Sequence, residues 1–261
     1  MVFLLYLSVF LLSRENRPYS VCNCALYIPF FGCYPVLAKN GSGKGTGGVA
    51  LPEEEIEALA DRLYRAYAAL PEADKRRVDP ELMAEKLLGL RVVYRRLSRD
   101  GSILGITAPE SVGVPVLEGG GKAWFFLDGN TILLDAGLLS PWASKGRRRF
   151  TLMHEIGHRL LQGAPSARTE GLADRLASAL LMPRRLVERN LLACAWLPGP
   201  IPDRRLDPKR WQVFEALAET MGVSRQALAI RLEQLGLTEN QGGWTLGPLP
   251  TLIPEAGELE E

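Results

Sequence analysis

Apolar residues recur at helical spacing directly after a short acidic cluster. Glu53, Glu54 and Glu55 suit the first turn of a helix, where the helix dipole favours negative charge. The apolar positions that follow are Ile56, Leu59, Ala60, Leu63 and Tyr67. This pattern predicts a helix, and Asp79-Pro80 predicts the start of a second one over 81–88.

Shorter apolar runs follow, separated by Gly, Pro and Asp. They predict strands over 91–97, 103–107, 123–127 and 131–134. Asp128-Gly129-Asn130 stands between the last two runs and is typical of a hairpin turn. Helices followed by a small antiparallel sheet and then by more helices indicate the α+β class.

Two longer helices are expected in the middle of the chain. The first covers residues 147–162, and the second covers residues 170–182 and is stopped by Pro183. The residues between them, 163–166, read Gly-Ala-Pro-Ser and form a loop. The two helices can therefore fold back on each other as neighbours.

Residues 211–237 predict a pair of helices with helix-turn-helix spacing. Ala218 supplies the small residue of the first helix, Gly222 the turn and Leu228 the apolar residue of the second. Ser224 stands where it would cap the second helix. The segment is therefore interpreted as a helix-turn-helix-like subdomain.

Such a unit can place its second helix in the major groove of DNA, with Arg225, Gln226 and Arg231 as candidate contacts. The alternative is a helical subdomain that packs on the rest of the protein and holds a protein partner. The net charge is +1, and the unit itself carries glutamates. Because no basic stripe supports phosphate binding, direct DNA binding is the less favoured of the two.

The N-terminal region differs in composition from the rest of the chain. Residues 2–12 are an apolar run, shorter than the about 20 residues that span a bilayer and without the positive charge that precedes a signal core. The run is interpreted as a disordered extension or a start codon placed too early, with a poor signal or anchor as the alternative. Residues 39–48 are interpreted as a flexible linker; a phosphate-binding loop is the alternative, but Ala38 stands where that motif needs glycine.

The cysteine content argues against a protein stabilised by disulfides. The chain of 261 residues has four cysteines, of which Cys194 lies far from Cys22, Cys24 and Cys33. They are too few and too scattered for a disulfide framework, which favours a reducing, cytoplasmic location. No stable membrane association is expected.

The strongest chemical pattern lies on the helix predicted over 147–162. His154 and His158, the two histidines of the whole chain, are four residues apart and share one helix face, so both can bind one metal ion. Glu155 is rotated from them by about 100° and can reach a water at the metal without being a ligand. Two imidazoles and a carboxylate that leave a position for water suit Zn²⁺ in a hydrolytic site.

A third protein ligand is expected on the next helix. Glu170 stands at its start and would ligate zinc, while Asp174, one turn further on the same face, would accept the outer N–H of a ligand histidine and fix its tautomer. The alternative is that Glu170 is only an acid that complements the helix dipole.

These residues carry a resemblance to the ImmA/IrrE family of metallopeptidases. The matching motifs are Phe150-Thr151 before His154-Glu155-Ile156-Gly157-His158, then Glu170-x-x-Ala173-Asp174, then Leu180-Leu181-Met182-Pro183. The likeness is close over 150–183 and loose from residue 80. It implies a zincin-like domain with zinc ligands His154, His158 and Glu170 and with Glu155 as general base.

The resemblance also implies a biological setting. Family members typically cleave a helix-turn-helix (Xre-type) transcriptional repressor in a stress or mobile-element response, so a regulatory zinc endopeptidase is expected. The alternative is a DNA-binding transcriptional regulator with a structural or sensory metal site. The expected organisation is an extension over 1–48, a metallopeptidase domain over 49–195, the helix-turn-helix-like subdomain over 205–240 and an acidic tail over 241–261.

Overall fold

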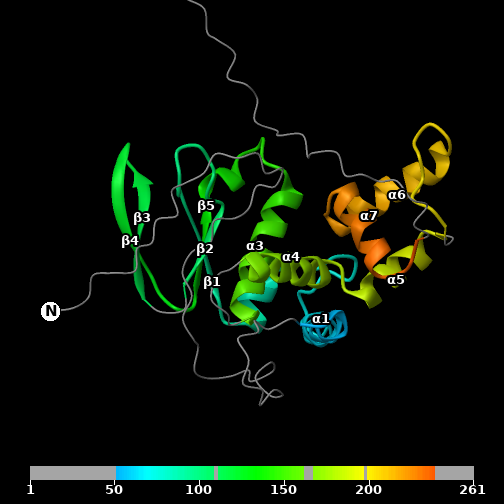
Figure 1. Ribbon diagram of the computed structural model, residues 1–261, viewed down its shortest axis with the longest axis horizontal. Helices are drawn as coiled ribbons and strands as arrows, with labels where there is room; N and C mark the ends of the chain where they lie inside the picture. The colour runs from blue at the N-terminus through cyan, green and yellow to red at the C-terminus, as the bar shows by residue number, and fades with distance from the viewer. Residues whose placement is uncertain (1–50, 109–110, 162–166, 197–198, 239–261) are drawn as a thin grey trace, which may run out of the picture. The chain divides into compact units, whose positions relative to one another are not determined.

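The computed structural model describes residues 51–108, 111–161, 167–196 and 199–238 (Figure 1). The predictions for the apolar run 2–12, the linker 39–48, the first three cysteines and the acidic tail 241–261 lie outside these residues. No helix in the described part of the chain combines the length and the apolar character that a bilayer crossing needs.

Helices open the described chain, as the hydrophobic pattern predicts. Helix α1 (Glu53–Ala68) has its three glutamates in the first turn and buries Ile56 and Tyr67 on its inner side. Helix α2 (Pro80–Leu82) continues into a π-helical turn, η1 (Met83–Leu87), so the predicted helix over 81–88 is present but irregular. Asp79 caps it, because its carboxylate accepts hydrogen bonds from the N–H groups of Glu81 and Leu82.

The strands form two small sheets. In the first, β5 (Thr131–Asp135) lies between β1 (Arg91–Arg95) and β2 (Gly105–Thr107). In the second, β3 (Val112–Glu118) pairs with β4 (Gly121–Leu127). The prediction of the α+β class is confirmed. The expectation of purely antiparallel pairing is wrong for one pair, because β1 and β5 run parallel, and three other strands separate them in the sequence.

The hairpin predicted at Asp128-Gly129-Asn130 is also wrong. The chain does turn there, and Asp128 accepts hydrogen bonds from Asn130 N–H and from the hydroxyl of Thr131. However, β4 and β5 belong to different sheets. The hairpin turn is Gly119-Gly120, whose φ angles of 58° and 84° suit the tight turn between β3 and β4.

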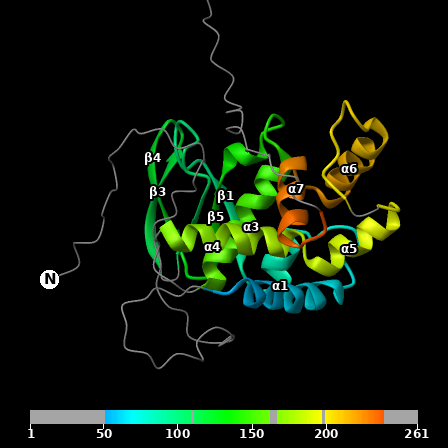
Figure 2. The same ribbon diagram turned by 45° about the vertical axis from the view of Figure 1, so that its right-hand side comes forward.

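Helix α3 (Lys145–Leu161) follows a short 3₁₀ turn, η2 (Ala136–Leu139), and lies beside the three-stranded sheet. It contacts β2 and β5 on one side and α4 (Ala167–Leu181) on another. Figure 2 shows α3 and α4 next to each other. The β3–β4 hairpin packs its inner side chains on the other side of this sheet, around Leu133 of β5. The three-stranded sheet therefore lies between the β3–β4 hairpin and α3.

Three more helices complete the described chain: α5 (Arg184–Ala193), α6 (Pro208–Met221) and α7 (Arg225–Gln234). Gly222 ends α6 in the left-handed conformation with φ of 67°, and the Ser224 hydroxyl accepts a hydrogen bond from Ala227 N–H to cap α7. The local geometry predicted for this pair is therefore present. Its apolar side joins the main core through Phe214, Leu228 and their neighbours.

Arg231, one of the candidate DNA contacts, is fully buried. Its guanidinium binds both carboxylate oxygens of Glu57 at 2.6 and 2.9 Å and the carbonyl of Met182 at 2.9 Å. The prediction that Arg231 is available to DNA is wrong, because the side chain anchors α7 to α1 and to the end of α4. Arg225, another candidate contact, is exposed but pairs with Glu215.

Candidate metal centre and active site

The two histidines lie side by side on the buried face of α3. Each is only 4% exposed, and their Nε2 atoms are 3.0 Å apart. The four-residue spacing on a regular helix produces this arrangement, as the sequence predicts. Both rings therefore turn one nitrogen towards the same point.

Glu170 approaches that point from α4. Its Oε2 lies 3.3 Å from Nε2 of His154, and its Oε1 lies 3.4 Å from Nε2 of His158. The three side chains offer ligand atoms that all lie within 4.8 Å of one another and could hold a metal ion. Two imidazole nitrogens and a carboxylate oxygen form a donor set that zinc prefers.

Burial raises the pKa of Glu170, but the nearby imidazoles of His154 and His158 outweigh this effect and lower the pKa to about 2. Within the described part of the chain, buried Oε2 of Glu170 has no hydrogen-bond donor of good geometry. A metal cation among the three ligand atoms would satisfy this oxygen. The residues present thus fit a bound metal.

A close contact between α3 and α4 brings Glu170 within reach. Gly157 faces Ala173, and a Cβ on Gly157 would lie 3.1 Å from the Ala173 carbonyl oxygen and 3.3 Å from its Cα. Because glycine has no side chain, α4 can approach α3 closely at this position. The contact sits between the two histidines on one helix and the glutamate on the other.

Asp174 lies where the sequence places it, one turn beyond Glu170. Its Oδ1 is 2.8 Å from Nδ1 of His154. A proton on Nδ1 would be held in this hydrogen bond, which leaves Nε2 as the lone-pair nitrogen that faces His158 and Glu170. The tautomer suits metal binding through Nε2.

Glu155 lies next to His154 in sequence but is not part of the ligand cluster. Its side chain is fully buried and reaches β2, where it packs against Gly105. Among the described residues, Glu155 is therefore not one of the side chains that could hold a metal ion together, as expected of a general base.

Two residues on or against α3 have contacts that the sequence does not reveal. Gly105 is only part of a predicted strand, and nothing local distinguishes it from other strand glycines. Arg149 is only part of the predicted helix, yet its guanidinium donates to the carbonyl oxygens of Val78 at 2.6 Å, Gly222 at 3.0 Å and Met221 at 3.3 Å. These contacts join segments far apart in sequence, so a periodic pattern could not reveal them.

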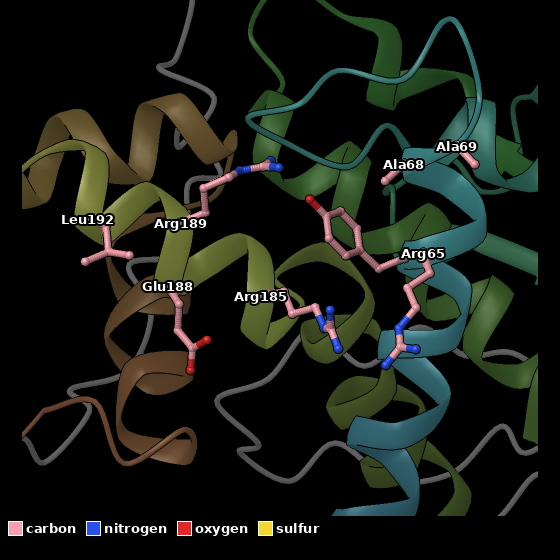
Figure 3. A pocket seen from close by; sticks show the side chains of 8 residues that line it. Arg65, Ala68, Ala69, Arg185, Glu188, Arg189 and Leu192 are labelled. Atoms are coloured by element: carbon pink, nitrogen blue, oxygen red, sulfur yellow. The ribbon is translucent and has the colours of Figure 1, made fainter.

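A shallow groove lies elsewhere, between α1 and α5 (Figure 3). Arginines and small or apolar side chains line it: Tyr64, Arg65, Ala68, Ala69, Arg185, Glu188, Arg189 and Leu192. None of these belongs to the His154–His158–Glu170 cluster. The chemistry is therefore assigned to the cluster on α3 and α4.

Comparison with known proteins points the same way. Residues 138–233 match a family model described as the IrrE N-terminal-like domain, a peptidase family designated M78. The match runs from the turn before α3 to near the end of α7 and includes the whole cluster. No curated protein matched the chain. The resemblance noted in the sequence is confirmed.

Proposed function

We propose that the protein is a zinc-dependent endopeptidase of regulatory type, because residues 138–233 match the model of the IrrE N-terminal-like peptidase domain. The observation that carries this proposal is the cluster itself: His154, His158 and Glu170 converge on one point. Glu155, a buried residue, directly follows His154 on the same helix. The natural substrate would be a helix-turn-helix transcriptional repressor, which would place the reaction in the cytoplasm.

His154, His158 and Glu170 would hold the metal, and Asp174 would keep His154 in the required tautomer. When bound, zinc would supply Lewis-acid polarisation of the peptide carbonyl and a lower pKa for water at the site. Glu155 would take the proton from the attacking water and pass it to the amine nitrogen of the departing peptide. Burial of the cluster would exclude bulk water and strengthen these electrostatic contacts.

Support for a restricted substrate comes from the α6–α7 unit. It packs against the helices of the site, since Arg149 of α3 binds the carbonyl groups that end α6. Docked on α3 in this way, the unit would give a protein substrate a second surface to contact.

Co-expression with a small helix-turn-helix repressor encoded by a neighbouring gene tests the proposal. We expect a specific cut in the repressor, and Glu155→Gln should slow it by about 10²–10⁴-fold while retaining zinc. Zinc content of the purified variant is the control for folding. Cleavage at the wild-type rate by Glu155→Gln would rule the mechanism out.

The DNA-binding alternative has weaker support. Of its candidate contacts, Arg231 is buried and Arg225 pairs with Glu215. A salt-sensitive, sequence-specific gel shift in the absence of proteolysis would favour it.

A further inference from the structure

Gly105 of β2 lies directly against the side chain of Glu155. A Cβ built on Gly105 would stand 2.5 Å from Oε1, 2.8 Å from Cδ and 2.9 Å from Cγ of Glu155. Non-bonded carbon and oxygen atoms do not approach so closely. Any side chain at position 105 would therefore collide with the whole outer half of Glu155, not only with its tip.

The backbone does not explain why glycine stands at this position. Gly105 belongs to a regular strand and pairs with Leu134 of β5, so another residue could adopt its conformation. Glycine inside a strand weakens it and often marks a place where another group approaches closely. At this position the approaching group is the Glu155 carboxylate.

Strand β2 has little freedom to retreat from α3. Asp135 N–H donates to the Leu104 carbonyl at 2.8 Å, and β5, which pairs with β2 in the sheet, is buried along its whole length. Beyond β2, Arg159 of α3 donates to the Ala108 carbonyl at 3.3 Å. Since the strand is held on both sides of Gly105, added volume at this position would displace Glu155.

We propose that Gly105 is a positioning residue for the general base. Its missing side chain leaves the space in which the Glu155 carboxylate lies, one residue along α3 from ligand His154. The inference rests on the proposed function, because it assigns Gly105 a part in the same reaction. Displacement of a catalytic group by about 1 Å lowers rates by about 10²-fold.

Gly105→Ala tests this inference, with Gly113→Ala as the matched control. Gly113 is also a strand glycine, but an added Cβ would meet Trp124 at an ordinary 3.4 Å. We expect Gly105→Ala to lower kcat on the cleaved repressor about 100-fold, with KM and the zinc Kd within about twofold of wild type. Gly113→Ala should retain wild-type values. A wild-type kcat in Gly105→Ala would overturn the inference.

A double-mutant cycle measured by thermal unfolding separates this inference from the proposed function. Gly105→Ala should lower Tm by about 5 °C in the wild-type background and by much less beside Glu155→Ala, which removes the crowded atoms. Equal losses in both backgrounds would overturn the contact, and so would failure of both Gly105→Ala chains to fold. If wild type cleaves no repressor, the proposed function fails, and this cycle alone decides the Gly105–Glu155 contact.

Discussion

His154 has two ring nitrogens, and the structure gives each of them a different task. Nδ1 lies 2.8 Å from Asp174, while Nε2 faces His158 and Glu170. The sequence predicts this division because positions 154, 158, 170 and 174 fall at one-turn intervals on two helices. Spacing on a helix is a local property, so the meeting of these side chains could be predicted without any knowledge of the fold.

Replacement of Asp174 tests the division at the residue scale. Asp174→Ala should weaken zinc binding about tenfold to a hundredfold, because Nδ1 of His154 loses its partner. The Asp174 side chain is 58% exposed, so the fold should tolerate the change. Competition with a chelator measures the Kd, and Glu188→Ala, an exposed acid on α5, is the control. Equal Kd values for the two variants would contradict the assigned role.

Helices α3 and α4 together bring His154, His158 and Glu170 to one point. The sequence predicts both helices and that they fold back as neighbours, but it does not identify Ala173 as the partner of Gly157. The strands are harder to predict than the helices. The sequence does not predict β3, because Pro115 and Gly113 interrupt its strand pattern. It does not predict the parallel pairing of β1 with β5 either, because no local pattern connects these segments.

Two glycines test the contact between α3 and α4. Gly157→Ala should lower the free energy of unfolding by about 1–3 kcal/mol and weaken zinc binding, because the added methyl forces α3 and α4 apart. Gly171→Ala on α4 has open space around its Cβ and should raise stability by about 0.5–1 kcal/mol. Denaturant unfolding measures both changes. A stable Gly157→Ala protein with normal zinc binding would show that the close approach has no role.

At the scale of the whole molecule, two arginines, one half-buried and one fully buried, join the α6–α7 unit to the rest of the described chain. Arg149 connects α3 to the end of α6, and burial lowers the pKa of its guanidinium. Arg231 connects α7 to Glu57 of α1 and to Met182. The sequence pattern suggested a surface role for Arg231, because periodicity on a short helix cannot show which side another helix covers.

Replacement of Arg231 should strongly destabilise the fold. Arg231→Met leaves Glu57 and the Met182 carbonyl without their partner and should lower the free energy of unfolding by about 3 kcal/mol. Glu57→Leu in the same chain should recover much of this loss, since both charges are then gone. Arg225→Met, which breaks an exposed pair, should cost less than about 1 kcal/mol. Urea unfolding that gave equal losses for the two arginine variants would refute the anchoring role.

Zinc binding by the purified protein tests the central claim most directly. Equilibrium dialysis followed by metal analysis should find a single zinc ion per chain in wild type and in Glu155→Gln. Glu170→Gln should bind zinc more weakly by at least about a hundredfold, because it removes a ligand and not only a supporting hydrogen bond. Wild-type protein without stoichiometric zinc affinity, or undiminished binding by Glu170→Gln, would contradict the assignment of His154, His158 and Glu170 as the metal centre.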